Sequence, residues 1–80
     1  MKRMYCILLL QENNFAVALS NNATDAVKKN HGYYVASGYD PKKYFACFAF
    51  ESIEDRNDTA SSFDKLGLKF DTRDDGLVEG

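Results

Sequence analysis

Two stretches of the chain are apolar at nearly every position, and both predict strands that are covered on two faces. Residues 4–10 (Met-Tyr-Cys-Ile-Leu-Leu-Leu) and 44–50 (Tyr-Phe-Ala-Cys-Phe-Ala-Phe) place apolar side chains on both sides of a two-residue period. Strands of this kind lie in the interior of a sheet. Polar residues 12–14 then supply a turn, and residues 15–20 (Phe-Ala-Val-Ala-Leu-Ser) are interpreted as the returning strand of a hairpin.

A short first helix is predicted after Asn22, whose side chain can cap the helix start. Asp25 would lie in the first turn, and Lys28 and Lys29 near the end, where each charge interacts favourably with the helix dipole. Gly32 follows the last turn. The apolar face is thin, so this helix depends on contacts with the rest of the fold.

A second helix is predicted to begin after Ser52 and to run to about Lys65, with Gly67 as its stop. Its inward stripe is expected to contain Ile53, Ala60, Phe63 and Leu66.

Residues 68–80 form a separate C-terminal segment after a domain of residues 1–67. Apolar and polar residues alternate from Leu68 to Thr72, which predicts either an edge strand or an arm exchanged in a dimer. Leu68 and Phe70 would then cover the core of their own chain or make a dimer contact. The polar, acidic end from Arg73 onward is expected to fray.

Together these elements predict an α+β fold. We expect a small three-stranded antiparallel sheet, built in the order hairpin, helix, strand, helix, with the helices packed on it and an extra C-terminal edge strand as an option. Residues 5–10 would form the central strand, between the hairpin partner and residues 44–50. Any small α+β sandwich with such a sheet is the alternative.

With 80 residues, the chain is short of core for a stable domain, which makes a homodimer a serious option. Two cysteines and one histidine are too few for a structural zinc site, so no metal and no cofactor are expected. Cys6 and Cys47 lie in apolar runs and are interpreted as buried thiols.

Charge is unevenly distributed along the chain. Lys and Arg outnumber Asp and Glu by six to three through Ala49, whereas acidic residues outnumber basic ones by nine to four after it. This balance argues against a general affinity for DNA or for acidic membranes. The longest apolar run is far too short to span a membrane, so a cytoplasmic protein is expected.

The segment after the first helix contains three tyrosines in seven residues, Tyr33, Tyr34 and Tyr39. One interpretation is that they cover a core that is too small to close itself. The other is an aromatic contact surface for a partner.

The order of elements resembles that of the GIY-YIG nuclease domain. Tyr5 lies ten residues before Phe15, residues 15–22 (Phe-Ala-Val-Ala-Leu-Ser-Asn-Asn) look like the second motif of that family, and Phe50-Glu51-Ser52 looks like the approach to its last helix. The resemblance covers residues 4–66 and implies that residues 1–67 form a GIY-YIG-like domain.

The same resemblance implies that the domain is catalytically inactive. Tyr5 keeps the first tyrosine of the family. The other matching positions carry side chains without the required chemistry: Ala16 and Ala18 for a tyrosine and a glycine, Ala26 or Val27 for the arginine, and Ala60 for the metal-binding glutamate. Losing the arginine and the metal ligand together removes the groups that stabilise charge on the phosphate, so we expect no enzyme activity.

Three hypotheses of function follow. The first is a non-catalytic protein-binding module, a small phage-type inhibitor that blocks a larger defence-system enzyme in the host cytoplasm. The alternative is a non-catalytic nucleic-acid-binding domain that uses the tyrosines together with Lys2, Arg3, Lys28 and Lys29. The third is a metal-dependent nuclease with relocated residues.

Overall fold

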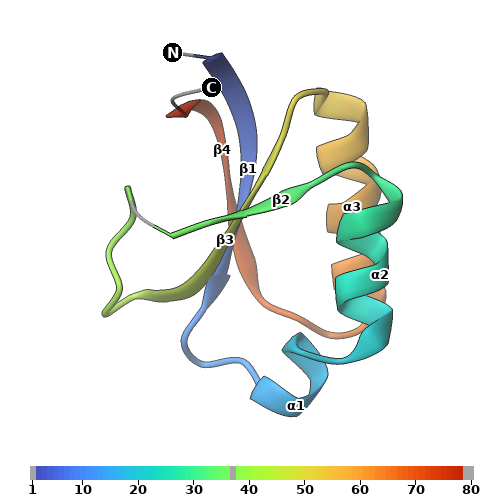
Figure 1. Cartoon of the computed structure of the whole chain (residues 1–80). Coiled ribbons are helices and arrows are strands. Elements are labelled where there is room, and N and C mark those ends of the chain that lie inside the picture. The colour runs from blue at the N-terminus through green and yellow to red at the C-terminus, as the bar shows by residue number, and fades with distance from the viewer. Residues whose placement is uncertain (1, 37, 79–80) are drawn as a thin grey trace.

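The computed structural model describes residues 2–36 and 38–78, and four strands form one antiparallel sheet in the order β2-β3-β1-β4. Helices α2 and α3 lie side by side on one face of this sheet (Figure 1). The elements are, in chain order, β1 (Lys2–Leu10), α1 (Phe15–Ala18), α2 (Asn21–Lys29), β2 (Tyr33–Val35), β3 (Tyr44–Phe50), α3 (Ile53–Lys65) and β4 (Phe70–Val78).

Apart from the single turn of α1, this is the β-α-β-β-α-β arrangement of the ferredoxin-like, split βαβ topology. The α+β class is therefore confirmed, and the C-terminal edge strand is present as β4. The sheet has four strands rather than three. This topology hosts many unrelated functions and assigns none by itself.

The hairpin expected at residues 15–20 is wrong, because this segment forms the helix α1. Asn14 caps it, with the Ala16 N–H donating to Asn14 Oδ1 at 2.9 Å. Asn13 exchanges two hydrogen bonds of 2.6 Å with the backbone of Lys69, directly before β4. Since β4 occupies one side of β1 and β3 the other, no place remains beside β1 for a third partner.

Helix α2 begins two residues before the expected start. Ser20 is the N-cap in place of Asn22, with the Ala23 N–H donating to Ser20 Oγ at 3.5 Å, so Asp25 lies beyond the first turn. The predicted end is confirmed, because the chain leaves α2 at Asn30 and turns through His31, which has a φ of 60°.

The central position of β1 and the double-sided burial of β1 and β3 are confirmed. On the helix side of the sheet, the core is built on Phe50 and Phe63, neither of which is exposed to solvent. They pack with Ile7, Leu9, Val27 and Leu68.

A row of four aromatic rings crosses this core from edge to edge. Tyr34 of β2 contacts Phe48 of β3, Phe48 contacts Phe63 of α3, and Phe63 contacts Phe70 of β4, with ring centroids 6.2, 6.0 and 6.2 Å apart. All three contacts are edge-to-face, the geometry that aromatic quadrupoles favour. Phe63 therefore joins the helix layer to both halves of the sheet.

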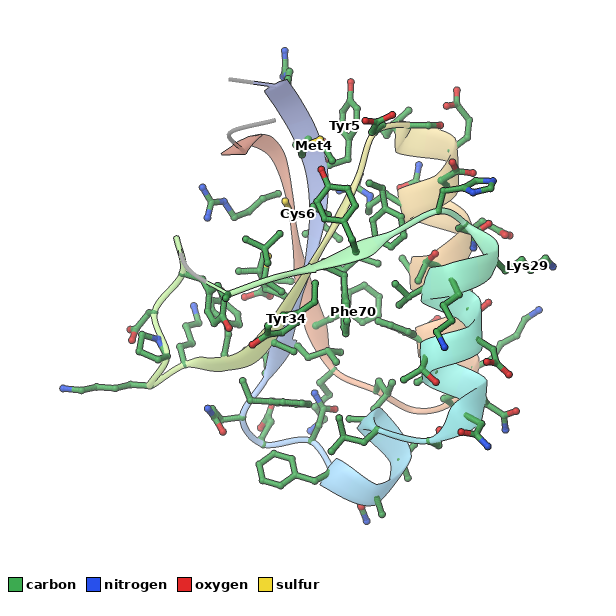
Figure 2. The ribbon with its side chains drawn as sticks, viewed as in Figure 1. Met4, Tyr5, Cys6, Lys29, Tyr34 and Phe70 are labelled. Carbon is green, nitrogen blue, oxygen red and sulfur yellow. The ribbon has the colours of Figure 1, made fainter. Side chains whose placement is uncertain are left out.

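The opposite face of the sheet has a second cluster of buried residues but no helix among the described elements. Met4, Cys6 and Leu8 of β1 lie there with Cys47 and Ala49 of β3. Side chains from the sheet margin cover them, namely Val35, Tyr39 and Tyr44. Figure 2 shows Met4 and Cys6 on β1, away from the helices. Side chains of β2, β3 and the loop between them thus cover this face of the sheet.

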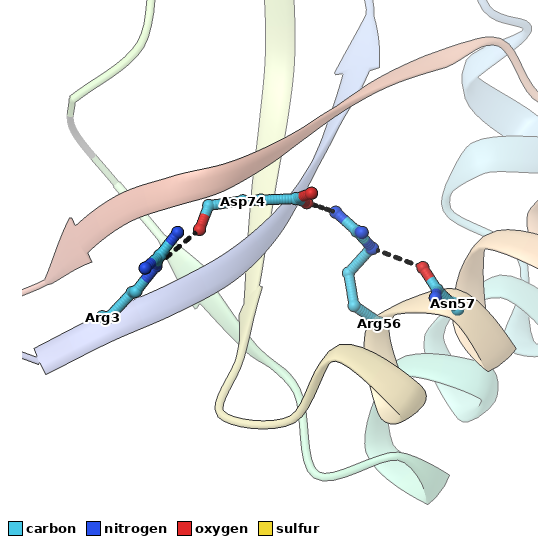
Figure 3. A network of polar contacts seen from close by, with 4 residues as sticks. All are labelled: Arg3, Arg56, Asn57 and Asp74. Carbon is cyan, nitrogen blue, oxygen red and sulfur yellow. Dashed lines mark hydrogen bonds and ion pairs between the residues drawn. The ribbon is translucent and has the colours of Figure 1, made fainter.

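Helix α3 begins after its N-cap Ser52 as predicted, and Ala60, Phe63 and Leu66 of the expected inward stripe pack in the helix-side core. Arg56, Thr59 and Phe63 are the buried residues, whereas Ile53 is exposed. The Arg56 Nη1–H donates to Asp74 Oδ1 at 2.6 Å, and its Nε–H donates to Asn57 Oδ1 at 2.8 Å (Figure 3). This ion pair fastens β4 to the helix layer.

Candidate functional site

The positions that the nuclease resemblance singles out do not form a reactive group. Tyr5 is half-buried on β1 opposite Phe50, while Ala16 is exposed on α1 and Ala18 is buried in the helix-side core. Ala26 and Ala60 are half-buried on α2 and α3. Among the described residues, no three His, Cys, Asp or Glu side chains gather into a set that could hold a metal ion.

The three tyrosines singled out in the sequence do not share one surface. Tyr33 and Tyr34 are neighbours on β2 and therefore point to opposite faces of the sheet. The Tyr33 hydroxyl donates to Met4 Sδ at 3.5 Å on the face without helices. Tyr34 lies on the helix side against Phe48, and its hydroxyl is 3.2 Å from that of Tyr39. Tyr34 and Tyr39 therefore meet around the β2 edge, whereas the Tyr33 hydroxyl lies on the other face of the sheet.

The contact between these two phenols changes the acidity of Tyr39. The hydrogen bond with Tyr34, followed by desolvation and by the charge that Tyr34 would carry, raises the pKa of Tyr39 from 10.0 to about 12. Because the pKa is higher in the folded state, its contribution to stability is complete below pH 10 and is lost as the pH rises toward 12.

In a spectrophotometric titration of the native protein, we expect one tyrosine to ionise near pH 12. Tyr39→Phe should remove this late step, and Tyr34→Phe should shift its midpoint down toward 10 because the hydrogen bond is lost. Tyr33→Phe is the matched control and should leave the late step in place. Circular dichroism at each pH separates this ionisation from alkaline unfolding. A late step that survives Tyr39→Phe would contradict the assignment.

Apolar side chains at α1 and on β2 are more than half exposed to solvent. Phe15 and Leu19 at the two ends of α1 are 52% and 66% exposed, and Tyr34 is 56% exposed. The Phe15 ring rests on Phe45, with centroids 4.9 Å apart, as Tyr34 rests on Phe48. We call these five residues the edge surface: Phe15, Leu19, Tyr34, Phe45 and Phe48.

A hollow of about 210 Å³ opens between α2 and β2, beside the edge surface. Phe48 and Val27 give it an apolar lining, and Lys28 adds a positive charge. No described strand pairs with the outer side of β2, so the hollow adjoins an open strand edge. The complete lining is Thr24, Val27, Lys28, Gly32, Tyr33, Tyr34 and Phe48.

A larger hollow of about 380 Å³ lies in the groove between α2 and α3. Ala26 and Leu66 line it together with charged groups of both signs, among them Asp25, Lys29 and Lys65. Figure 2 shows Lys29 extending outward from α2. This groove contains none of the exposed aromatic side chains that distinguish the β2 edge.

The interpretation of Cys6 and Cys47 as buried thiols is confirmed. A hydrogen bond with Cys6, together with desolvation, raises the pKa of the Cys47 thiol. A thiol with a raised pKa is a poor nucleophile. His31 is exposed at the end of α2, away from the strand face that buries both cysteines.

Leu68 and Phe70 cover the chain's own core, which is one of the two roles expected for them. Leu68 belongs to the helix-side cluster, and the Phe70 ring contacts Phe63. Figure 2 places Phe70 between the sheet and the helices.

Sequence reasoning missed Phe15 and Leu19, because a strand was assigned to their segment. Phe15 and Leu19 are four residues apart and follow Asn14, a residue type that caps helices. This pattern is the signal that would have placed both side chains on one side of a capped helical turn.

None of the described helices has the length and apolar character needed to cross a membrane. Comparison with protein-family models, curated proteins and solved structures gave no match to this chain. The GIY-YIG resemblance therefore stays a prediction.

Proposed function

We propose that this chain is a protein-binding module whose edge surface receives an extended, apolar segment of a partner protein. The observation that carries the proposal is the apolar hollow beside the open edge of β2, where Tyr34 is more than half exposed. An apolar hollow with an exposed aromatic side chain beside it is typical of an interaction site in a folded protein.

The edge strand and the hollow bind different parts of the partner segment. An extended segment can pair its backbone with the outer side of β2 and direct one apolar side chain into the hollow above Phe48 and Val27. Tyr34 lies at the rim of the hollow. Tyrosine is one of the residue types enriched among the residues that dominate the binding energy of protein interfaces. Lys28 favours an acidic residue beside the inserted side chain.

A domain of this size that docks on a larger enzyme would cover part of its surface. The hypothesis drawn from the sequence adds that such binding inhibits the enzyme. That the partner is an enzyme of the host also comes from this hypothesis alone.

Selection from a library of random peptides on the immobilised protein tests the proposal. We expect enriched peptides to combine aromatic or aliphatic residues with an acidic residue. Tyr34→Ala and Leu19→Ser should each weaken their binding by about tenfold, as for interface anchors. Ile53→Ser is the matched control, since Ile53 is an exposed apolar residue on α3 outside the edge surface, and should bind like the parent.

Two results would overturn the proposal. One is a selection that enriches no peptide, or only peptides whose binding is unchanged by Tyr34→Ala and Leu19→Ser. The other is salt-dependent binding of a single-stranded oligonucleotide that is lost on Lys28→Glu, which would support the nucleic-acid alternative because Lys28, Tyr33 and Tyr34 line one hollow.

A further inference from the structure

Strand β4 presents the longer of the two open edges of the sheet. Its nine residues pair with β1 on one side, and no described strand pairs with the other (Figure 1). The other edge strand, β2, has only three residues. A long open edge exposes backbone N–H and C=O groups that readily pair with another strand.

The side chains of β4 are complementary to those of a second, antiparallel copy of the same strand. Asp71 pairs with Leu8 and Arg73 with Cys6 in the register with β1, so both charged side chains point to the face away from the helices. In an antiparallel pair related by a twofold axis at Thr72, Asp71 of each copy faces Arg73 of the other, and Thr72 faces Thr72. Opposite charges and threonine pairs at such positions stabilise a sheet.

Neighbouring registers lack this complementarity. A twofold axis at Asp71 would place two aspartates opposite each other, and an axis at Arg73 would oppose two arginines. Like charges directly across two strands are destabilising. The charges therefore favour the register that is centred on Thr72 over those centred on Asp71 and Arg73.

Both side chains already have partners in their own chain, so pairing with a second copy adds to those contacts or replaces them. The Asp71 carboxylate is 47% exposed, and its Oδ2 accepts from the Tyr44 hydroxyl at 2.5 Å and lies 3.8 Å from Lys43 Nζ. The Arg73 Nη1–H donates to the Gly38 carbonyl at 3.0 Å, and a guanidinium has five N–H donors in all. Asp74, on the other face of the strand, is held by Arg56 and stays within its own chain.

We propose that two copies of this chain associate through antiparallel pairing of β4 with β4, with a twofold axis at Thr72. The four strands of each copy then form one continuous sheet with the helices of both copies on the same face. A second copy also supplies the additional buried surface that a chain of 80 residues needs. Because β2 and β4 lie at opposite edges, dimer formation leaves the edge surface accessible, and the proposal stands independently of the proposed function.

Molar mass measured by sedimentation over a range of concentrations tests the dimer. The parent should approach twice 9.0 kDa. Arg73→Asp and Asp71→Arg should each weaken association by about tenfold or more, because every dimer then contains two like-charge contacts. The double variant Asp71→Arg with Arg73→Asp restores both opposite-charge pairs and should restore the dimer.

Tyr44→Phe is the matched control for the Asp71 variants. It removes the hydrogen bond to Asp71 without changing any charge at the strand edge, so the dimer should persist. Circular dichroism confirms that each variant is folded. A parent that stays at 9.0 kDa at about millimolar concentration would overturn the proposal, as would single variants that dimerise like the parent or a double variant that stays monomeric.

Discussion

Phe63→Ala is expected to lower the free energy of unfolding by about 3–5 kcal/mol, the largest effect of any single substitution considered for this chain. Phe63 is completely buried on α3, and its ring contacts both Phe48 and Phe70 in the aromatic row. Removing the ring leaves a cavity between the helix layer and two strands. Since small domains are stable by only about 5–15 kcal/mol, much of the chain should unfold at 37 °C (about 310 K).

Denaturant unfolding followed by circular dichroism measures this effect. Phe15→Ala is the control, because Phe15 is also aromatic but more than half exposed, and its replacement should cost less than about 1 kcal/mol. A loss below about 1 kcal/mol for Phe63→Ala would contradict the role assigned to the aromatic row.

Gly32→Ala is expected to destabilise the fold by about 2–3 kcal/mol through overpacking. A Cβ atom at Gly32 would lie 2.4 Å from Phe50 Cε2 and 2.9 Å from Val27 Cγ1. Phe50 is completely buried, and side chains in a close-packed core move aside only at the expense of their neighbours. The Gly32 N–H also donates to the Val27 carbonyl at 2.9 Å, so the backbone is held in place at the end of α2.

The neighbouring residue gives a contrasting variant. His31 adopts a φ of 60°, which costs about 1–2 kcal/mol for a residue with a Cβ atom, so His31→Gly should raise the melting temperature. Gly32→Ala should destabilise the fold through crowding, whereas His31→Gly should stabilise it by relieving backbone strain. Comparing the two variants therefore separates these effects. A Gly32→Ala variant as stable as the parent would show that Phe50 can move aside.

Much of this fold follows from local patterns in the sequence. The continuous apolar character of β1 and β3 predicts interior strands, and Ser52 predicts the start of α3. The alternation after Gly67 predicts an edge strand, which is present as β4. In each case the side-chain pattern and the final packing favour the same structure.

The segment of α1 could not be assigned in this way. Its alternating small and large apolar residues suit a strand as well as a helical turn. The choice depends on β4, which lies more than 50 residues later and takes the place beside β1. The burial of Arg56 also depends on a residue far away in the sequence. It can be predicted only once Asp74 of β4 is known to pair with the guanidinium.

The candidate site was predictable only in part. Tyr34 belonged to the expected aromatic contact set, whereas Tyr33 from the same set points to the other face because β2 is a strand. Phe15 and Leu19 became visible as surface residues only after α1 was found. The open edge of β2 is a property of the strand order, which local patterns do not specify.

The pairing of β1 with β4 also has a consequence for how the protein is made. Lys2 pairs with Val78, so this ladder joins two strands that are separated by residues 11–69 of the chain. Until residues 70–78 have been made, β1 has apolar side chains on both faces and lacks β4, one of its two neighbours in the finished sheet. The sheet can therefore be completed only after β4 has been made, and contacts of such long sequence separation slow folding.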